Sequence, residues 1–404
     1  MNSTQALDGL KVLDLSRVLA GPFCTQMLSD LGAQVWKIEP PWGDDTRQWG
    51  PPFQGGESAY FLSANRGKKS VAVNIKQPRG AALVRDLAAR ADVLVENFKR
   101  GDLQRFGLDY ESLSRVNPAL VYASITGFGQ NGPRAEEPGY DVVLEALTGI
   151  MSVTGEPDGP PNKVGVAWID ILTGLTAVVG ILAAINERSV SGRGQYIDLG
   201  LFDVGFMAMV NQAQRYLMTG VAPQRMGNAH PQIVPYQTFQ ASDGWFMLAV
   251  GNDGQYQRMT GAIDHPELWD DERFRTNAGR VEARGELVGR LADIFRRQPR
   301  AHWVARLKPA GVPAAPVQDM GEAFSDPHTQ ARQVLWHLHH GKLGEVPSVA
   351  NALQHMSRTP ATAAAAPPLL GEHTAEVLGE VLGMDERALT PLLEAGVIAG
   401  RKPD

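Results

Sequence analysis

The first 125 residues repeat one pattern of hydrophobic and polar positions. Apolar runs of strand length alternate with stretches of helical spacing, and the runs occupy 11–16, 33–39, 70–75, 91–98 and 120–125. Strands that alternate with helices in this way are typical of βαβ units and a parallel sheet, hence of an α/β fold. Because parallel sheets bind ligands at the carboxyl ends of their strands, three loops deserve scrutiny, at 17–22, 97–105 and 126–141.

Beyond residue 220 the pattern changes. Two apolar runs within 234–251 flank a Ser-Asp-Gly turn, which predicts a β-hairpin. Leu287, Leu291 and Ile294 then fall on one face of a predicted helix. We therefore predict a large α/β domain over 1–220, a smaller α+β domain over 225–328, and a C-terminal segment over 330–404.

Composition excludes several classes of protein. The net charge of −6 offers no concentrated basic surface for nucleic acid. The single cysteine, Cys24, rules out an internal disulfide framework and a thiolate metal cluster, and it fits a reducing compartment. The N-terminus lacks the basic start of a signal peptide, and the most apolar stretch, 172–185, is shorter than the ~18–20 residues of a membrane span. We expect a cytoplasmic protein without membrane or metal partners, and a buried core helix at 172–185.

A glycine-rich loop follows the strand at 120–125. Gly127, Gly129 and Gly132 form a literal G-x-G-x-x-G, but Pro133 directly after them breaks any opening helix. A dinucleotide fingerprint needs that helix. The pattern therefore favours a loop close to a ligand's backbone over a nicotinamide or flavin site.

Asp170 precedes a long apolar helical stretch and allows two interpretations. It could be a helix N-cap, a position that aspartate favours. Alternatively, the helix N-terminus could keep its carboxylate ionised, and such a charged, poorly solvated carboxylate, with Gly174 in the following turn, could act as a nucleophile. Spacing alone leaves both open.

Two further groups of polar residues stand out. Basic residues cluster beside the strand ends of the first half and together would suit phosphate groups, although a solvated face is the default for each: Arg66, Lys68, Lys69, Lys76, Lys99, Arg100 and Arg105. His337 and His339 would share one face of a strand, with His340 on the other. No acidic residue or cysteine stands among these histidines, so an exposed strand is favoured over a metal site.

Motifs along the whole chain resemble the class III coenzyme A-transferases. They occur in the expected order: SRVLAGPF (16–23), DLGAQVWKIEPP with GDDTR (30–47), NRGKKSVAVNIK (65–76), VENF (95–98), ITGFGQNGP (125–133), PGYD (138–141), the Asp170 segment and PLLGEHT (368–374). The resemblance implies an interlocked homodimer. It also implies a Rossmann-like large domain, to which the C-terminal segment returns, with a small domain between.

The resemblance also implies the site residues. The catalytic carboxylate falls on Asp170, which would attack an acyl-CoA to form an aspartyl anhydride and then an enzyme–CoA thioester. Coenzyme A or acyl-CoA is then a substrate, with no tightly bound cofactor. The implied coenzyme contacts are Leu19, Ala20, Val73, Asn74, Ile75, Lys76, Asn97, Phe98, Lys99, Arg105, Tyr140 and Asp141.

Among the branches of this family, the chain most resembles the glutarate CoA-transferases. This resemblance implies a succinyl-CoA donor and a dicarboxylate acceptor such as glutarate. The second carboxylate needs a cation or amide donors, and the candidates are Arg17, Arg47, Arg225 and His230. Oxalate, carnitine, mesaconate, citramalate and aromatic acids remain open as acceptors. Pro40 follows the Lys-Ile-Glu triplet where some members carry a basic residue, so the nucleotide end of coenzyme A must be held differently.

Two alternatives remain. The α-methylacyl-CoA racemases share the fold but use a histidine in an A-G-H-D motif, where this chain has Tyr140 in Pro-Gly-Tyr-Asp. A tyrosine, with a reference pKa of about 10, is a poor substitute for that histidine. A non-catalytic acyl-CoA-binding protein is the other alternative, but such a protein would not require Asp170.

Overall fold

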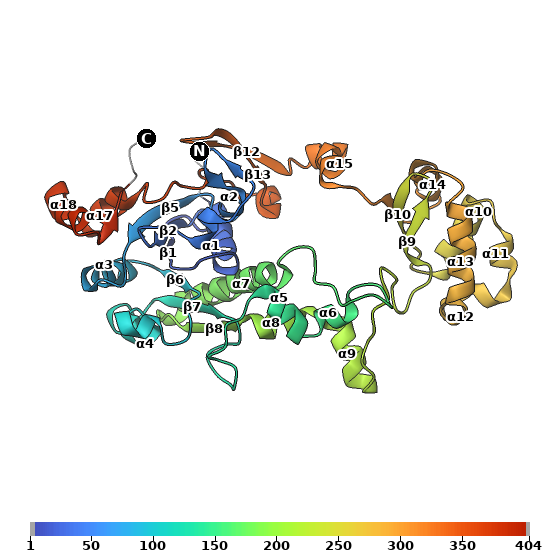
Figure 1. The fold of residues 1–404 in the computed structure, drawn as a ribbon, viewed down its shortest axis with the longest axis horizontal. Helices are drawn as coiled ribbons and strands as arrows, with labels where there is room; N and C mark the ends of the chain where they lie inside the picture. The colour runs from blue at the N-terminus through green and yellow to red at the C-terminus, as the bar shows by residue number, and fades with distance from the viewer. Residues whose placement is uncertain (1–4, 401–404) are drawn as a thin grey trace. The chain divides into compact units, whose positions relative to one another are not determined.

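A computed structural model describes residues 5–400. The chain divides into two compact units (Figure 1). The first contains the residues up to 150, 164–214 and those from 332 onward, and the second contains 151–163 and 215–331.

The first unit is built on a seven-stranded sheet with the order β14-β5-β2-β1-β6-β7-β8. Its strands are β1 (Lys11–Asp14), β2 (Gln34–Glu39), β5 (Lys68–Val73), β6 (Val93–Glu96), β7 (Val121–Thr126), β8 (Tyr196–Gly200) and β14 (Ile398–Ala399). All neighbours are parallel except β14, which pairs antiparallel with β5. The strand order reverses between β1 and β6, the topological switch point where doubly wound sheets bind ligands.

Both faces of this sheet are covered by helices (Figure 1). Neighbouring strand residues such as Val12 and Leu13 point to opposite faces, because the side-chain period of a strand is two. One face packs against α3 (Pro78–Ala88), α4 (Tyr110–Val116), α17 (Thr374–Leu382) and α18 (Glu386–Glu394). The other packs against α1 (Ala20–Asp30), α7 (Trp168–Ser191) and α8 (Leu201–Ala208). The strands are apolar on both sides because both are buried.

The predicted strands of the first half are confirmed as β1, β2, β5, β6 and β7. Pro78 is the first residue of α3, where its missing N–H costs nothing. The edge strand β8 was not predicted, because its half-buried sequence Tyr-Ile-Asp-Leu-Gly carries a weak apolar signal. The final strand β14 is only two residues long and was also missed.

Helix α7 buries one face only. Ile169, Ala177, Ile181 and Ala184 are buried, whereas Val179 is 67% exposed. The expectation of a fully buried core helix is therefore right for one side and wrong for the other. By length and composition alone, this 24-residue helix could also cross a membrane.

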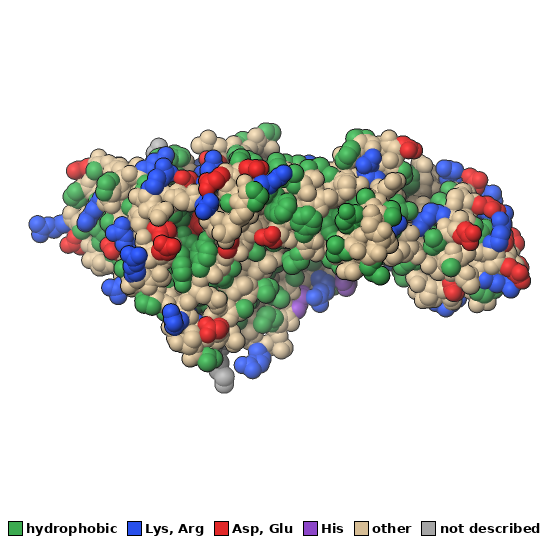
Figure 2. Space-filling model, turned by 90° about the horizontal axis from the view of Figure 1, so that it is seen from below, with side chains coloured by type: hydrophobic (Ala, Val, Ile, Leu, Met, Phe, Trp, Pro, Cys, Tyr) green, Lys and Arg blue, Asp and Glu red, His purple; other side chains and the backbone are tan. Residues whose placement is uncertain are grey.

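More apolar side chains are exposed on α8 and on α9 (Val210–Thr219), a helix with no buried residue. They include Phe206, Met207, Leu217 and Met218. Figure 2 shows hydrophobic side chains among polar ones on the face of the molecule seen from below.

The second unit has an antiparallel sheet of β9 (Tyr236–Ala241), β10 (Gly244–Ala249) and β11 (Ala314–Pro316). The predicted hairpin is β9–β10, and the predicted helix is α13 (Arg284–Phe295), whose Leu287, Leu291 and Ile294 are buried. Aromatic rings fill the core between sheet and helices.

The remaining hairpins belong to the first unit: β3 (Phe53–Gln54) with β4 (Glu57–Ser58), and β12 (Leu335–His340) with β13 (Gly344–Val349). His337 and His339 lie exposed on β12, and His340 is buried. Within residues 5–400, no three His, Cys, Asp or Glu side chains are grouped so as to hold a metal ion.

Candidate active site

The loop after β1 and the loop after β6 are joined at the switch point. The Asn97 side chain accepts a hydrogen bond from the Arg17 N–H at 2.8 Å and donates one to the Arg17 carbonyl at 2.7 Å. Both polar atoms of the Asn97 amide are thus used to hold the first loop. Asn97, implied as a coenzyme contact, therefore has a structural task as well.

The first loop contains a strained residue. Val18 has φ +69°, a left-handed conformation that is a genuine outlier for a β-branched side chain. Helix α1 follows at once, with Leu19 as N-cap and no side-chain cap. In the described chain, no acceptor is hydrogen-bonded to the N–H groups of Leu19, Ala20 and Gly21. These free donors at a helix N-terminus favour negative charge.

Helix α7 is capped by a residue from another helix. Its own N-cap, Ala167, offers no side-chain acceptor. Instead Asp141, the first residue of α5 (Asp141–Leu147), accepts from the N–H of Ile169 at 2.7 Å and of Asp170 at 3.0 Å. The hypothesis that Asp170 is the N-cap is therefore wrong. Asp170 lies in the first turn with its carboxylate free for other contacts.

Close packing brings α7 against α1. A Cβ on Gly174 would lie 2.7 Å from the carbonyl oxygen of Ala20, so a side chain there would push the helices apart. Gly174 is one helical turn beyond Asp170, and the two share a face of α7. Gly174 thus allows the close packing of α7 against α1 just beyond the Asp170 carboxylate.

A cavity of about 350 Å³ opens at this junction. Its walls hold Asp170 and seven of the implied coenzyme contacts: Leu19, Ala20, Asn97, Phe98, Lys99, Tyr140 and Asp141. Gly127, from the glycine-rich loop after β7, also lines it, and no helix opens at Gly132. The loops at 17–22, 97–105 and 126–141 therefore meet at one cavity, as the parallel sheet predicted.

The Asp170 carboxylate is less acidic than the sequence suggested. Burial, followed by the charge of Asp141, raises the pKa of Asp170 to about 7. At neutral pH the carboxylate is therefore only partly ionised, whereas the helix N-terminus by itself would favour the charged form. The capping carboxylate satisfies the first N–H groups of α7 and brings a like charge close to Asp170.

Tyr60, in the short helix α2 (Ala59–Ser63), was missed by sequence reasoning. Burial and the nearby Asp170 raise the pKa of Tyr60 to about 12. Its phenol is therefore neutral near the site, and no spacing signal in the sequence linked it to Asp170.

A second cavity, of about 210 Å³, is lined by Val73, Asn74, Ile75 and Lys76. It shares Arg17 and Phe98 with the first cavity. Pro40 lies on its wall together with Trp42, and the Lys76 ammonium is 5.8 Å from the centre of the Trp42 ring. Arg105 lines neither cavity and pairs with Asp102 at 2.7 Å.

The phosphate-binding cluster suggested by the sequence does not form as a whole. Most of its members are engaged in ion pairs with nearby carboxylates: Arg66 with Asp30, Lys68 with Asp14, Lys69 with Glu376, Arg100 with Glu136 and Arg105 with Asp102. Lys76 and Lys99 line the second and the first cavity. Sequence proximity to strand ends did not reveal the carboxylates that neutralise the others.

The four residues expected to bind the second carboxylate of the acceptor do not lie together. Arg47 forms a two-pronged ion pair with Glu39, at 2.7 and 2.8 Å, and stacks over Phe61. Arg225 donates to backbone carbonyls within the second unit, where His230 also lies. Arg17 lines the cavity that contains Asp170.

Comparison with known proteins identifies the fold family. A family model described as CoA-transferase family III matches residues 7–374. The chain belongs to this family. Transfer of coenzyme A, after which this family is named, fits a carboxylate beside free backbone donors at a sheet switch point.

Among curated relatives, the succinate–glutarate CoA-transferase of Agrobacterium fabrum is 45% identical over 96% of this chain and 99% of its own length. The succinyl-CoA:glutarate CoA-transferase of Homo sapiens is 42% identical over 98% of this chain and 91% of its own. A crystal structure of a CAIB/BAIF family protein from Brucella suis superposes with a TM-score of 0.86 and 46% identity, covering 94% of this chain and all of that one.

Proposed function

We propose that this CoA-transferase moves coenzyme A from succinyl-CoA to a free dicarboxylate such as glutarate, with Asp170 as nucleophile. The observation that carries the proposal is the position of Asp170. It lies in the first turn of α7, in the cavity that Leu19 and Ala20 of the α1 N-terminus also line. The substrates of the similar Agrobacterium and human enzymes support the choice of donor and acceptor.

The proposed reaction has four steps. The Asp170 carboxylate attacks the thioester carbonyl, the C–S bond breaks, and an acyl-aspartyl anhydride and CoA thiolate result. The thiolate attacks the aspartyl carbonyl, releasing succinate and forming an enzyme–CoA thioester. The incoming carboxylate attacks this thioester, forms a second anhydride and expels the thiolate. The thiolate then attacks the new acyl group, which yields the product acyl-CoA and restores the carboxylate.

Each attack produces an oxyanion that needs hydrogen-bond donors. The unpaired N–H groups of Leu19 and Ala20, which line the cavity, suit this task, because preorganised backbone donors stabilise a developing oxyanion. The raised pKa of Asp170 makes its carboxylate a stronger nucleophile than an ordinary aspartate, provided that it is ionised. The reaction should therefore be favoured above neutral pH.

The coenzyme would extend from the Asp170 cavity into the cavity lined by residues 73–76. The shared residues Arg17 and Phe98 support this path, as does the strand order of the first unit, which matches a Rossmann-like sheet. Trp42 offers an aromatic surface to the coenzyme beside Pro40. The Arg17 guanidinium would bind the second carboxylate of the acceptor.

The proposal includes an interlocked homodimer in the cytoplasm. A second copy would cover the apolar side chains exposed on α7, α8 and α9, which are too numerous for a solvated surface. The outward face of α7 then needs no membrane to cover it.

A transfer assay tests the proposal. Enzyme and succinyl-CoA are mixed with free acids, and new acyl-CoA species are detected by mass spectrometry. We expect glutaryl-CoA, and its loss in Asp170→Ala. Transfer to another acid instead would keep the transferase mechanism and show that glutarate is not the acceptor. Exchange of an α-proton on a 2-methylacyl-CoA without transfer would support the racemase alternative, and binding without turnover would support a non-catalytic role.

A further inference from the structure

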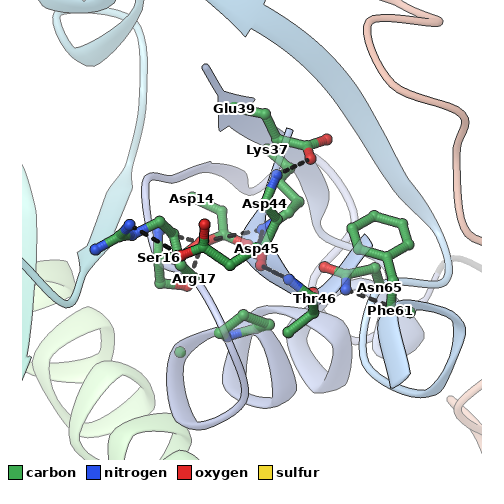
Figure 3. Close-up of polar contacts among 12 residues, drawn as sticks. Asp14, Ser16, Arg17, Lys37, Glu39, Asp44, Asp45, Thr46, Phe61 and Asn65 are labelled. Carbon is green, nitrogen blue, oxygen red and sulfur yellow. Dashed lines mark hydrogen bonds and ion pairs between the residues drawn. The ribbon is translucent and has the colours of Figure 1, made fainter. Parts of the chain in front are cut away.

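A buried ionic network supports the backbone around Val18, and Figure 3 shows four of its members, Asp14, Lys37, Glu39 and Asp44. It contains three acids and three bases, so its formal charges cancel: Asp14, Glu39 and Asp44 with Lys37, Arg47 and Lys68. The side chains of Lys37, Asp44, Lys68 and Asp14 have no exposed surface. Such a network needs a reason, because apolar residues of similar volume often stabilise a core as well or better.

The two lysines of this network reach the backbone of the loop. Lys37 Nζ donates to the Ser16 carbonyl at 3.0 Å, and Lys68 Nζ donates to the Pro22 carbonyl at 2.9 Å. These two carbonyls lie on either side of the strained Val18. Lys37 therefore holds the start of the loop, and Lys68 holds the first turn of α1, into which the loop leads.

Carboxylates fix both ammonium groups in turn. Asp44 lies 3.0 Å from Lys37 Nζ, and Asp14 lies 3.0 Å from Lys68 Nζ. Asp14 also accepts from the N–H of Ser16 at 2.9 Å. Burial alone would raise the pKa of Asp14, but Lys68 and Lys37 lower it to about 2, so this carboxylate stays ionised.

The polar atoms near Val18 fall into two sets. The N–H and carbonyl of Ser16 and Arg17 are all bonded, to Asp14, Lys37 and Asn97. The next donors, from Leu19 to Gly21, have no acceptor in the described chain. A strained residue persists only where its surroundings over-determine it, and such residues concentrate at functional sites.

We propose that Lys37 and Lys68 are positioning residues, which clamp the start of the loop after β1 and the first turn of α1 and so hold the free N–H groups of Leu19 and Ala20 at the Asp170 cavity. This role rests on the proposed transfer chemistry for its effect on rate, but the clamp itself is testable without turnover. The buried ion pairs thus serve the geometry of the site rather than the stability of the fold.

The experiment compares Lys37→Met and Lys68→Met with Lys69→Met. Lys69 is the neighbouring residue on β5, but its ammonium pairs with Glu376 and Glu380 away from both cavities. We expect kcat to fall roughly 10- to 100-fold in the first two variants, with KM for the acyl-CoA changed less than about threefold, because positioning acts on the transition state. Lys69→Met should keep the wild-type kcat.

Amide hydrogen exchange of the peptide spanning 15–24 provides the second readout. Exchange should accelerate in Lys37→Met and Lys68→Met and stay unchanged in Lys69→Met. Asn97→Ala is a further variant for use if a lysine variant fails to fold. It removes the half-buried Asn97 amide, which bonds the N–H and the carbonyl of Arg17, and it leaves the ionic network intact. It should show the same faster exchange and the same fall in kcat.

The outcomes are distinguishable. Folded variants with wild-type exchange and wild-type kcat would overturn the clamp, as would an Asn97→Ala variant that raises KM alone. A wild-type enzyme that transfers coenzyme A to no acid would overturn the proposed function, while the exchange data would still decide whether the clamp exists.

Discussion

The two backbone segments that meet at the cavity are held in opposite ways. The loop after β1 is fixed through the N–H and carbonyl groups of Ser16 and Arg17, which precede the strained Val18, by Asp14, Lys37 and Asn97. The N-terminal turn of α7 is fixed by Asp141. A helix supports itself through its own hydrogen bonds and lacks partners only at its ends, whereas a strained loop must be held from outside.

We expect the largest effect from a substitution that breaks the support of the loop. Asp44→Asn removes the carboxylate that pairs directly with the buried ammonium of Lys37 and leaves only the more distant charges of Asp14 and Glu39, so we expect a loss of about 3–5 kcal/mol in the free energy of unfolding. The adjacent Asp45 is the control, because its pair with Arg17 is exposed on both sides. Asp45→Asn should change stability by less than about 1 kcal/mol. Urea unfolding of both variants tests this, and equal losses would contradict it.

We expect the next largest effect from a substitution that removes the cap of α7. Asp141→Ala removes the acceptor for the N–H groups of Ile169 and Asp170, so we expect transfer activity to fall about 100-fold through misplacement of Asp170. Stability should fall by about 1 kcal/mol.

The matched control is Asp385→Ala, which removes the cap of α18 by loss of its bond to the Ala388 N–H. It should cost similar stability and leave kcat unchanged. Steady-state kinetics at matched concentrations of folded enzyme decide between these expectations.

A smaller effect concerns the stability cost of Asp170 itself. Its folded pKa, about 7, lies above the ordinary value of 3.8, so the folded state holds a proton that the unfolded state releases between these values. Stability contributed by this group is therefore present at low pH and is lost as pH rises towards 7. Asp170→Asn should raise the Tm at pH 8, by roughly 2–4 °C for each kcal/mol recovered, and should not raise it at pH 4. An equal gain at both values would contradict the shift.

The smallest effect separates the two tasks of Asp141. Asp141→Asn keeps an acceptor oxygen for the α7 cap but removes the negative charge that, after burial, raises the pKa of Asp170. In the wild-type enzyme log kcat/KM should rise with pH around the Asp170 pKa of about 7, and in Asp141→Asn this midpoint should lie lower by up to roughly one pH unit. At pH values above the midpoint, kcat should be largely unchanged. An unmoved profile would mean that the Asp141 charge does not reach Asp170.

The sequence determined the sheet and the place of the site. Periods of two and 3.6 depend on local chain geometry, so β1, β2, β5, β6 and β7 could be predicted, and parallel strands direct a ligand to their carboxyl ends. The family motifs marked Asp170 without any structure. The half-buried edge strand β8 was missed because packing, not local pattern, makes it a strand.

The tertiary structure alone decided how the site residues are supported. Lys37 follows Trp36 in an apolar strand, and nothing near it shows that Asp44 and the Ser16 carbonyl will meet its ammonium. Asp141 caps a helix that begins 27 residues later in the chain, at Trp168. Both arrangements depend on charges and donors from distant segments, and burial then sets their strength. Local sequence therefore specifies the elements, while long-range contacts specify which charges are paired, which donors remain free and how acidic Asp170 is.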